Sequence, residues 1–399
     1  MPDRFVELRH GLISMADHVQ EHPRVWLDRV PAALLDRVPQ VKRQGDGSER
    51  WMLEGQLLEL GGVAAAAAML PDRTGNPQRW AEVPAAVWDP VERLAVMDGD
   101  GVDVSVLYPT VAGMAGENLA RLADPELQRV CVEAYNDWLI DEWAQSSARF
   151  IPLCIVPLSS IDATVAEVKR AVGRGHRGVI LPSIPADLQA LPHSNDLAWE
   201  PLWATCEELG VPICFQAGEA QRVQLAPHTS YSPALADALR AMTRPVSTVF
   251  VLVNLLMSRI LLRHPGLQAV FAESGIAWAA YLLEYADHQF EKDLLFNSYE
   301  LKPSEMFRRQ CCLTAWYEDM SLETRDFIGT DNIAWSTNFP LATSTWPNTR
   351  AMLARWGHRV PDEERARMLW GNAARIYGID TRHVGAGFAT RASTEPIAR

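Results

Sequence analysis

The segment PLWATCEELGVPICFQAG, residues 201–218, decides the fold, because it contains a helix, the signal that ends the helix and a buried strand. The sequence predicts a helix over residues 197–209, and Gly210 is typical of the residue that follows a helix end. The short apolar run VPICF, residues 211–215, predicts a buried strand. Helix and strand together form the repeating unit of a parallel sheet.

The same alternation continues on both sides of this segment. Asp124 and Pro125 are typical of a helix start, and that helix is predicted to continue to about residue 147. Other helices are predicted over residues 161–172, 247–263 and 276–295, and other strands over residues 12–15, 102–108, 150–157, 178–181, 267–272, 311–314 and 333–336. Strands that alternate with helices in this way favour an α/β fold, a (β/α)₈ TIM barrel, over a doubly wound sheet.

One segment interrupts the alternation. We expect residues 1–380 to form a single TIM-barrel domain with an insertion at about residues 31–89, after the first strand, that caps one barrel mouth. The insertion contains a predicted hairpin over residues 50–58 with Glu54 and Gly55 at its turn. Residues 381–399 are rich in Gly, Ala and Thr and are expected to form a flexible tail.

Composition excludes several classes of protein. The 399 residues carry 37 Lys and Arg against 50 Asp and Glu, and a net charge of −13 argues against nucleic acids and anionic membranes as partners. No stretch reaches the roughly 18 apolar residues that a spanning helix needs. The N-terminal residues lack the apolar region of a signal peptide, and six scattered Cys favour the cytoplasm. The 14 Trp outnumber the 11 Phe and also the 8 Tyr, and this excess predicts an aromatic pocket.

Several segments, in order along the chain, carry a resemblance to a known family: ISMADHVQEHPRVWLDRVP (13–31), ERLAVMDGDGVDVSVLYPT (92–110), AESGIAWAAYLLEYAD (272–287) and IGTDNIAWSTNFPLATSTWPNTR (328–350). From about Leu12 to Tyr377 the chain resembles the amidohydrolase-related family (amidohydrolase 2), which includes aminocarboxymuconate-semialdehyde and resorcylate-type decarboxylases. The resemblance implies a barrel with one divalent metal at its C-terminal mouth, held by residues of the first, fifth and eighth strands.

The chain departs from the ligand pattern that the resemblance implies. The first ligand aligns with Ala16, the histidine of the fifth strand with Gln216, and the aspartate of the eighth strand with Asn338. Only His18 keeps the family's residue, and neutral amides are weak ligands for zinc. We therefore expect no cofactor. A shifted zinc site made of His18, Glu21 and His22 is the alternative, although Pro23 interrupts this HxxEH pattern.

The candidate site follows from these positions. His18, Glu273 and Asp17 are the candidate catalytic residues, with His18 and Glu273 as an acid/base pair that needs no metal. Glu273 has a second interpretation, as the cap of the helix that begins near Ile276. The expected substrate-binding residues are two amides, three aromatic side chains and two residues of the loops after strands four and five: Gln216, Asn338, Trp278, Trp335, Trp26, His193 and Arg222.

These residues predict an amidohydrolase-like enzyme that acts without metal on a small hydrophobic or aromatic carbonyl compound. Ester or thioester hydrolysis, decarboxylation and cyclisation, possible steps of a biosynthetic pathway, stay open because a fold alone does not select a reaction. The alternatives are a catalytically inactive subunit that pairs with a metal-bearing relative, and a barrel that binds a ligand without turnover. For an active chain we expect a homodimer or pairing with a homologous amidohydrolase.

Overall fold

Parallel strands form the centre of the molecule. The computed structural model describes residues 6–58, 60–71, 73, 75–217, 233–294 and 297–382. One parallel sheet has the order β2-β6-β7 and a second has the order β12-β11-β10-β9-β8. The strands are β2 (Ile13–His18), β6 (Val104–Tyr108), β7 (Phe150–Pro152), β8 (Val179–Ile180), β9 (Ile213–Gln216), β10 (Ala269–Ala272), β11 (Cys311–Ala315) and β12 (Ile333–Trp335).

Backbone contacts at two seams join these sheets into a ring. At one seam Cys154, just after β7, forms an isolated parallel bridge with Val179 of β8. At the other seam the His18 amide donates to the Phe339 carbonyl at 2.7 Å, and the Asn338 amide donates to the Ala16 carbonyl at 3.1 Å. The last strand therefore meets the first, which confirms the predicted (β/α)₈ barrel.

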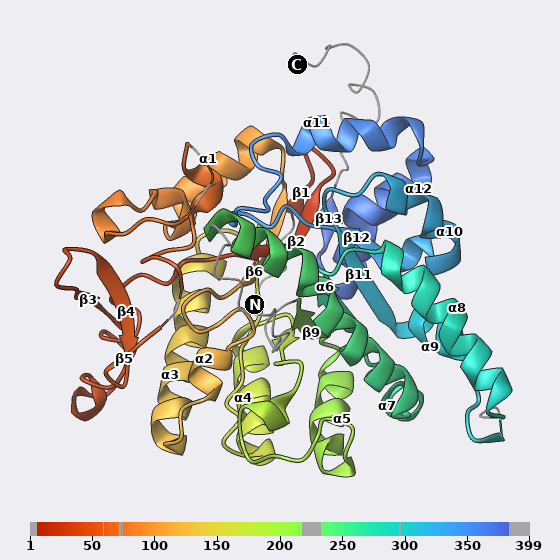
Figure 1. The fold of residues 1–399 in the computed structure, drawn as a ribbon, viewed down its shortest axis with the longest axis horizontal. Helices are drawn as coiled ribbons and strands as arrows, with labels where there is room; N and C mark the ends of the chain where they lie inside the picture. The colour runs from red at the N-terminus through yellow and green to blue at the C-terminus, as the bar shows by residue number, and fades with distance from the viewer. Residues whose placement is uncertain are drawn as a thin grey trace.

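Helices surround the ring (Figure 1). The capping residues confirm two of the expected helix ends: the Asp124 carboxylate accepts from the Glu126 and Leu127 amides, and Gly210 is left-handed at φ 64°. The helices are α1 (Pro90–Asp100), α2 (Glu117–Ala120), α3 (Pro125–Trp138), α4 (Ile161–Arg174), α5 (Glu200–Leu209), α6 (Pro233–Met257), α7 (Ile260–Arg263), α8 (Ala277–Lys292), α9 (Pro303–Gln310), α10 (Arg325–Ile328), α11 (Thr349–Ala354), α12 (Asp362–Ala366) and α13 (Asn372–Ile376).

Two helix predictions were wrong in their bounds. The helix predicted over residues 247–263 begins at Pro233 and ends at Met257, because it accommodates Pro245 inside it and stops before the left-handed Arg259. The helix predicted to reach residue 147 ends at Trp138, and residues 139–144 continue as a π-helical turn. A second π-helical turn, Arg367–Gly371, separates α12 from α13.

The insertion contains the predicted hairpin at the left edge of Figure 1. Its antiparallel strands are β3 (Gln40–Arg43), β4 (Glu49–Leu53) and β5 (Gln56–Leu57). Glu54 and Gly55 both have positive φ, 50° and 74°, as the tight turn between two strands requires. Elsewhere β1 (Val6–Glu7) pairs in parallel with β13 (Thr381–Arg382). The predicted tail lies outside the described residues from residue 383 onward.

Two further findings concern the chain as a whole. The six cysteines are buried free thiols, as expected of a chain without a disulfide framework. Among the described residues, no helix has both the length and the apolar character needed to cross a membrane.

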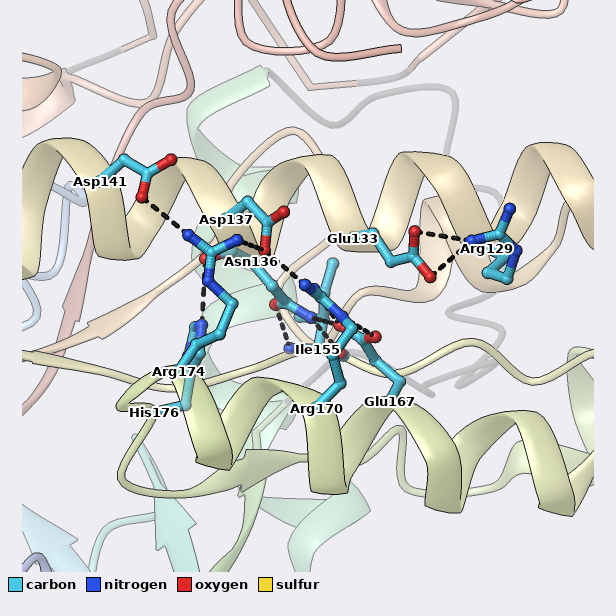
Figure 2. Close-up of polar contacts among 10 residues, drawn as sticks. All are labelled: Arg129, Glu133, Asn136, Asp137, Asp141, Ile155, Glu167, Arg170, Arg174 and His176. Carbon is cyan, nitrogen blue, oxygen red and sulfur yellow. Dashed lines mark hydrogen bonds and ion pairs between the residues drawn. The ribbon is translucent and has the colours of Figure 1, made fainter. Parts of the chain in front are cut away.

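Ion pairs join α3 to α4 beside a buried histidine (Figure 2). Arg170 of α4 contacts Asp137 of α3 at 2.7 Å and Glu167 at 2.7 Å. Near these pairs, His176 donates from Nε2 to the Asn136 carbonyl at 3.0 Å, while its Nδ1 is buried without a partner among the described residues. Burial lowers the pKa of His176 to about 4, so this histidine is neutral in the folded protein.

His176 should therefore make folding stability depend on pH. Its pKa falls from 6.5 to about 4 on folding, so its contribution is complete above pH 6.5 and is lost as the pH falls towards 4. The loss amounts to about 3 kcal/mol of unfolding free energy. Urea unfolding between pH 4 and 7 should show this dependence, and His176→Gln should weaken it because glutamine can still donate to Asn136 but does not titrate. Equal pH dependence in both proteins would contradict the assignment.

Candidate active site

His18 and Glu273 meet across the barrel mouth. His18 ends β2 and Glu273 follows β10, and these strands are not neighbours in the ring. His18 Nε2 lies 2.9 Å from Glu273 Oε1, and both side chains are buried. The sequence predicted this pair, and the structure brings its two members into contact at the C-terminal end of the strands, where barrel enzymes place their active sites.

The contacts of His18 fix the number of protons in the pair. His18 Nδ1 lies 2.8 Å from the Pro109 carbonyl oxygen, which can only accept, so Nδ1 carries a hydrogen. Nε2 is then either a lone-pair acceptor facing a protonated Glu273 or an N–H facing a carboxylate. In both forms one proton lies between the imidazole and the carboxyl group, and the pair can give that proton to a substrate.

Backbone conformation marks the same mouth. Glu273 has φ 51° and Asn338 has φ 55°, in the left-handed region that residues with a side chain rarely adopt. Such conformations cost of order 1–3 kcal/mol and persist where the surroundings impose them. At the start of the helix that Glu273 was alternatively expected to cap, Glu318 accepts from the Ile276 amide at 3.1 Å. The strain therefore accompanies the placement of two polar side chains at the mouth.

The amides at the mouth have unused hydrogen-bonding capacity. Gln216 ends β9 beside Ala272 of β10, and both its Oε1 and its Nε2 are buried without a partner among the described residues. Asn338 accepts from the Ser336 hydroxyl at 2.8 Å, while its Nδ2 is likewise buried and unpaired in the described structure. Unpaired buried amides are unfavourable. They are typical of a site that is completed by a ligand.

Asp17 does not join the pair. It precedes His18 in β2, so the two side chains leave the strand on opposite faces. Its oxygens accept from the hydroxyls of Ser105 at 2.6 Å and Ser14 at 2.9 Å, from the Thr337 hydroxyl, and from the Phe339 amide at 3.1 Å. Burial raises the pKa of the Asp17 carboxyl, and these donors oppose the rise. Asp17 thus holds the seam between β12, β2 and β6.

The residues of the shifted zinc site point to different partners. Glu21 accepts from the Val111 amide at 2.8 Å and the Ala112 amide at 3.1 Å, and burial raises its pKa to about 7. His22 packs against Trp80 and Trp88, with ring centroids 5.4 Å and 5.2 Å away. Across the described ranges, no three His, Cys, Asp or Glu side chains are grouped as metal ligands. The structure therefore does not assemble this alternative site.

The aromatic side chains predicted at the mouth lie mostly elsewhere. Trp26 donates to the Cys131 carbonyl of α3 and packs edge-on against Trp51, and Trp335 packs edge-on against Trp356. Trp335 therefore lies on the outer side of β12, because alternate residues of a strand face outward. Trp26 lies in a turn and packs between α3 and β4 of the insertion. Trp278 stays near Glu273, since its Nε1 donates to the Ser274 carbonyl at 2.8 Å.

Two loop residues remain among those predicted for the substrate rim. His193 is exposed and contacts Asn195 Oδ1 at 2.9 Å. Arg222 lies outside the described residues.

One residue that supports His18 was not predicted. Arg93 of α1 is buried and donates from Nη2 to the His18 carbonyl at 2.8 Å and from Nε to the Ala86 carbonyl. Its guanidinium also lies over the Phe339 ring, 4.5 Å from the centroid. Burial lowers the pKa of Arg93 to about 10, so it still carries its charge near neutral pH. A helix residue that contacts a backbone carbonyl leaves no signal in a single sequence.

Comparison with known proteins defines the class. The sequence matches the amidohydrolase family (Amidohydro_2) over residues 68–379, which is most of the chain. The chain belongs to the amidohydrolase family, as predicted. It is 23% identical to a gamma-resorcylate decarboxylase of Rhodococcus jostii over 330 residues, with 75% of this chain and 93% of the relative covered. It is 21% identical to a 2-amino-3-carboxymuconate-6-semialdehyde decarboxylase of Dictyostelium discoideum, with 75% and 79% covered. These matches confirm an enzyme of the hydrolase or lyase kind.

Solved structures share the fold. An amidohydrolase of Mycobacterium avium subsp. paratuberculosis matches with a TM-score of 0.73 at 19% identity, with 93% of this chain and 99% of that chain covered. A 5-carboxyvanillate decarboxylase of Novosphingobium aromaticivorans, crystallised with manganese and a nitrobenzoic acid, matches with a TM-score of 0.63 at 16% identity, with 94% and 99% covered. A dihydroxybenzoic acid decarboxylase of Polaromonas also contains manganese.

The manganese in these structures corrects the expectation of no cofactor. That expectation was wrong because it was based on zinc, for which amides are poor ligands. Carboxylate and carbonyl oxygens suit manganese. The side chains of Glu273, Gln216 and Asn338 offer such oxygens at one end of the barrel, and Gln216 Oε1 has no partner in the described structure. Gln216 Oε1 is therefore available to a hard divalent cation, whereas Glu273 Oε1 and Asn338 Oδ1 already contact His18 and Ser336.

Replacing Gln216 should separate stability from cation binding. Gln216→Met removes a buried amide that has no protein partner, so the unfolding free energy without added metal should rise by about 1 kcal/mol. Affinity for Mn²⁺, measured by calorimetry, should fall at least tenfold because an oxygen ligand is lost. Urea unfolding of the metal-free protein gives the stability.

Gln310→Met is the matched control. Gln310 is equally buried, but its Nε2 donates to the His264 and Leu267 carbonyls at 2.7 Å and 3.0 Å. Its replacement should lower the unfolding free energy by about 2 kcal/mol, since two acceptors lose their donor, and leave Mn²⁺ affinity unchanged. If both variants lose stability equally and bind Mn²⁺ equally, Gln216 is not a ligand of the cation.

Proposed function

We propose that this chain is a decarboxylase of small aromatic carboxylic acids. The observation that carries the proposal is the buried His18–Glu273 contact, in which Nε2 and Oε1 lie 2.9 Å apart. The relatives named as decarboxylases of gamma-resorcylate and of 2-amino-3-carboxymuconate-6-semialdehyde support this reaction over hydrolysis or cyclisation.

The shared proton suits the chemistry of aromatic decarboxylation. The ring carbon that bears the carboxylate takes the proton from the His18–Glu273 pair, and a C–H bond forms from ring π electrons. The bond between that carbon and the carboxylate then breaks, its electron pair returns to the ring, and carbon dioxide leaves. A solvent proton restores the pair. Each turnover thus consumes one proton and needs no oxidant or reductant.

The surrounding residues orient this proton. The Pro109 carbonyl fixes the His18 ring through Nδ1, and Arg93 holds the His18 backbone carbonyl. A divalent cation held by the oxygens of Glu273, Gln216 and Asn338 would supply positive charge for the substrate carboxylate. The unpaired Nε2 of Gln216 and Nδ2 of Asn338 can donate to oxygens of the substrate. Burial of the pair keeps water from competing for the proton.

Assembly and location extend the proposal. An exposed apolar face of α6, formed by Met242, Val246 and Phe250, supports pairing with a second copy or with a homologous amidohydrolase. The free buried cysteines support a reducing compartment such as the cytoplasm. Retention of the His18–Glu273 pair favours an active chain over an inactive subunit and over a barrel that only binds a ligand.

Replacing either member of the pair should slow turnover strongly without unfolding the protein. Glu273→Gln keeps the shape of the side chain but removes its carboxylate, and we expect kcat to fall 10²–10⁴-fold, as general acid–base groups contribute. His18→Gln should have a similar effect. Carbon dioxide release is measured with manganese-loaded protein and 2,6-dihydroxybenzoate or 5-carboxyvanillate.

Glu133→Gln is the control, because Glu133 pairs with Arg129 on the surface of α3, away from the mouth. It should keep the full rate. Turnover that survives in both Glu273→Gln and His18→Gln would refute the acid/base assignment. If the unmodified protein instead cleaves esters and releases no carbon dioxide from any aromatic acid tested, hydrolysis would replace decarboxylation as the proposed reaction.

A further inference from the structure

A cavity of about 420 Å³ opens at the end of the barrel opposite His18 and Glu273. Its walls come from Gln268, Arg309 and Asn332, which lie at or near the starts of β10, β11 and β12, and from the last helices. In a parallel barrel the strand starts lie at one mouth and the strand ends at the other. The volume lies within the range of small-molecule sites, roughly 300–1,000 Å³. This cavity is therefore separate from the candidate active site.

Positive charge is concentrated in its walls. Arg308, Arg309, Arg367 and Arg375 line the cavity together with a single carboxylate, Asp331. This local excess of cations contrasts with the net charge of −13 of the whole chain.

The guanidinium groups are only partly used by the protein. Within the described ranges, Arg308, Arg309 and Arg375 have no ion pair with a carboxylate. Arg308, Arg309 and Arg375 donate from Nη2 to the backbone carbonyls of Phe327, Leu261 and Asp331 respectively. Arg309 also donates from Nε to Gln310 Oε1 at 2.8 Å. Arg367 donates from Nη1 to Glu363 Oε1 and from Nη2 to the Thr330 hydroxyl, both at 3.4 Å. Its Nε lies 3.3 Å from Asp331 Oδ1 and is buried without a hydrogen-bond partner in the described structure. Several N–H groups are thus left for an anion.

A π-helical turn brings two of these arginines to one side. Arg367 begins the π-helical turn that ends at Gly371, and Arg375 lies in α13 directly after it. In a regular α-helix of 3.6 residues per turn, positions eight residues apart lie about 80° apart around the axis. A π-turn absorbs about one extra residue, so the eight-residue spacing becomes nearly two full turns. Both side chains can then line the same cavity.

We propose that this cavity binds a small anion with two or more negative charges, through phosphate or carboxylate oxygens. Guanidinium groups present paired N–H donors that match the oxygens of both groups. The charge of the walls favours a multivalent anion over a monovalent one, because four guanidinium groups face two carboxylates, Asp331 in the wall and Glu363 beside Arg367. Two strands connect this cavity with the candidate active site. β10 and β12 both begin at the cavity, and Glu273 follows the other end of β10 while Asn338 follows the other end of β12.

Calorimetric titration with inorganic pyrophosphate, and separately with citrate, tests the proposal at constant ionic strength. The unmodified protein should bind at least one of the two saturably with one site per chain. Arg309→Gln combined with Arg375→Gln should weaken that binding at least tenfold. Asp331→Asn should tighten it, because a carboxylate that lines the cavity loses its charge. Arg129→Gln, a surface arginine paired with Glu126 and Glu133, is the matched control and should change nothing.

The outcomes separate the ligand chemistries. Binding of pyrophosphate alone assigns a phosphate compound, and binding of citrate alone assigns a polycarboxylate. The proposal is overturned if neither anion binds saturably, or if the double variant and Arg129→Gln bind as the unmodified protein does. Asp331→Asn keeps the test decisive if the double variant does not fold, since unchanged affinity in Asp331→Asn would also count against the site.

Discussion

The carboxylate of Asp17 ties the first strand of the barrel to the last and to its other neighbour. Hydroxyls from β2, β6 and the segment after β12, together with the Phe339 amide, all donate to it. A buried carboxylate survives only with such donors, so the bonds are mutually dependent. Because the seam is closed at this point, His18 at the end of β2 faces Glu273 after β10. The acid/base pair therefore depends on a residue that takes no part in it.

The sequence was sufficient for the order of the elements and for one contact across the barrel. Gly210 and the Glu54–Gly55 turn predicted their local structures because positive φ strongly favours particular residues. His18 and Glu273 could be paired because both follow strands that end at the same mouth. The faces of Trp26 and Trp335 could not be assigned, because three-residue strands and loops give too few positions to set the alternation. Asp17 had no signal that separated a seam residue from a catalytic one.

The correction on metal has a chemical basis. Exchange of an acidic ligand for an amide removes a charge but keeps a carbonyl oxygen. A site with such exchanges changes its preference among cations rather than losing all affinity, because hard cations accept neutral oxygens. The expected ligands are missing at positions 16, 216 and 338, and only the exchange at Asn338 is of an aspartate for an amide. The structure adds a buried Gln216 oxygen without a protein partner in its described residues. Ligand type was thus a better guide than ligand charge.

Three unfavourable features of this fold occur at the mouth that holds His18 and Glu273. Glu273 and Asn338 adopt a backbone conformation that glycine would adopt without strain. Gln216 buries an unpaired amide, and an apolar side chain in its place would raise the unfolding free energy. For each position a more stable alternative is therefore available, and each alternative deletes a polar group of the mouth. Laboratory evolution that selected only for thermal stability would therefore remove the polar groups of the mouth while it stabilised the barrel. The positions that first drift to glycine or methionine in such an experiment would map the functional residues without any knowledge of the substrate.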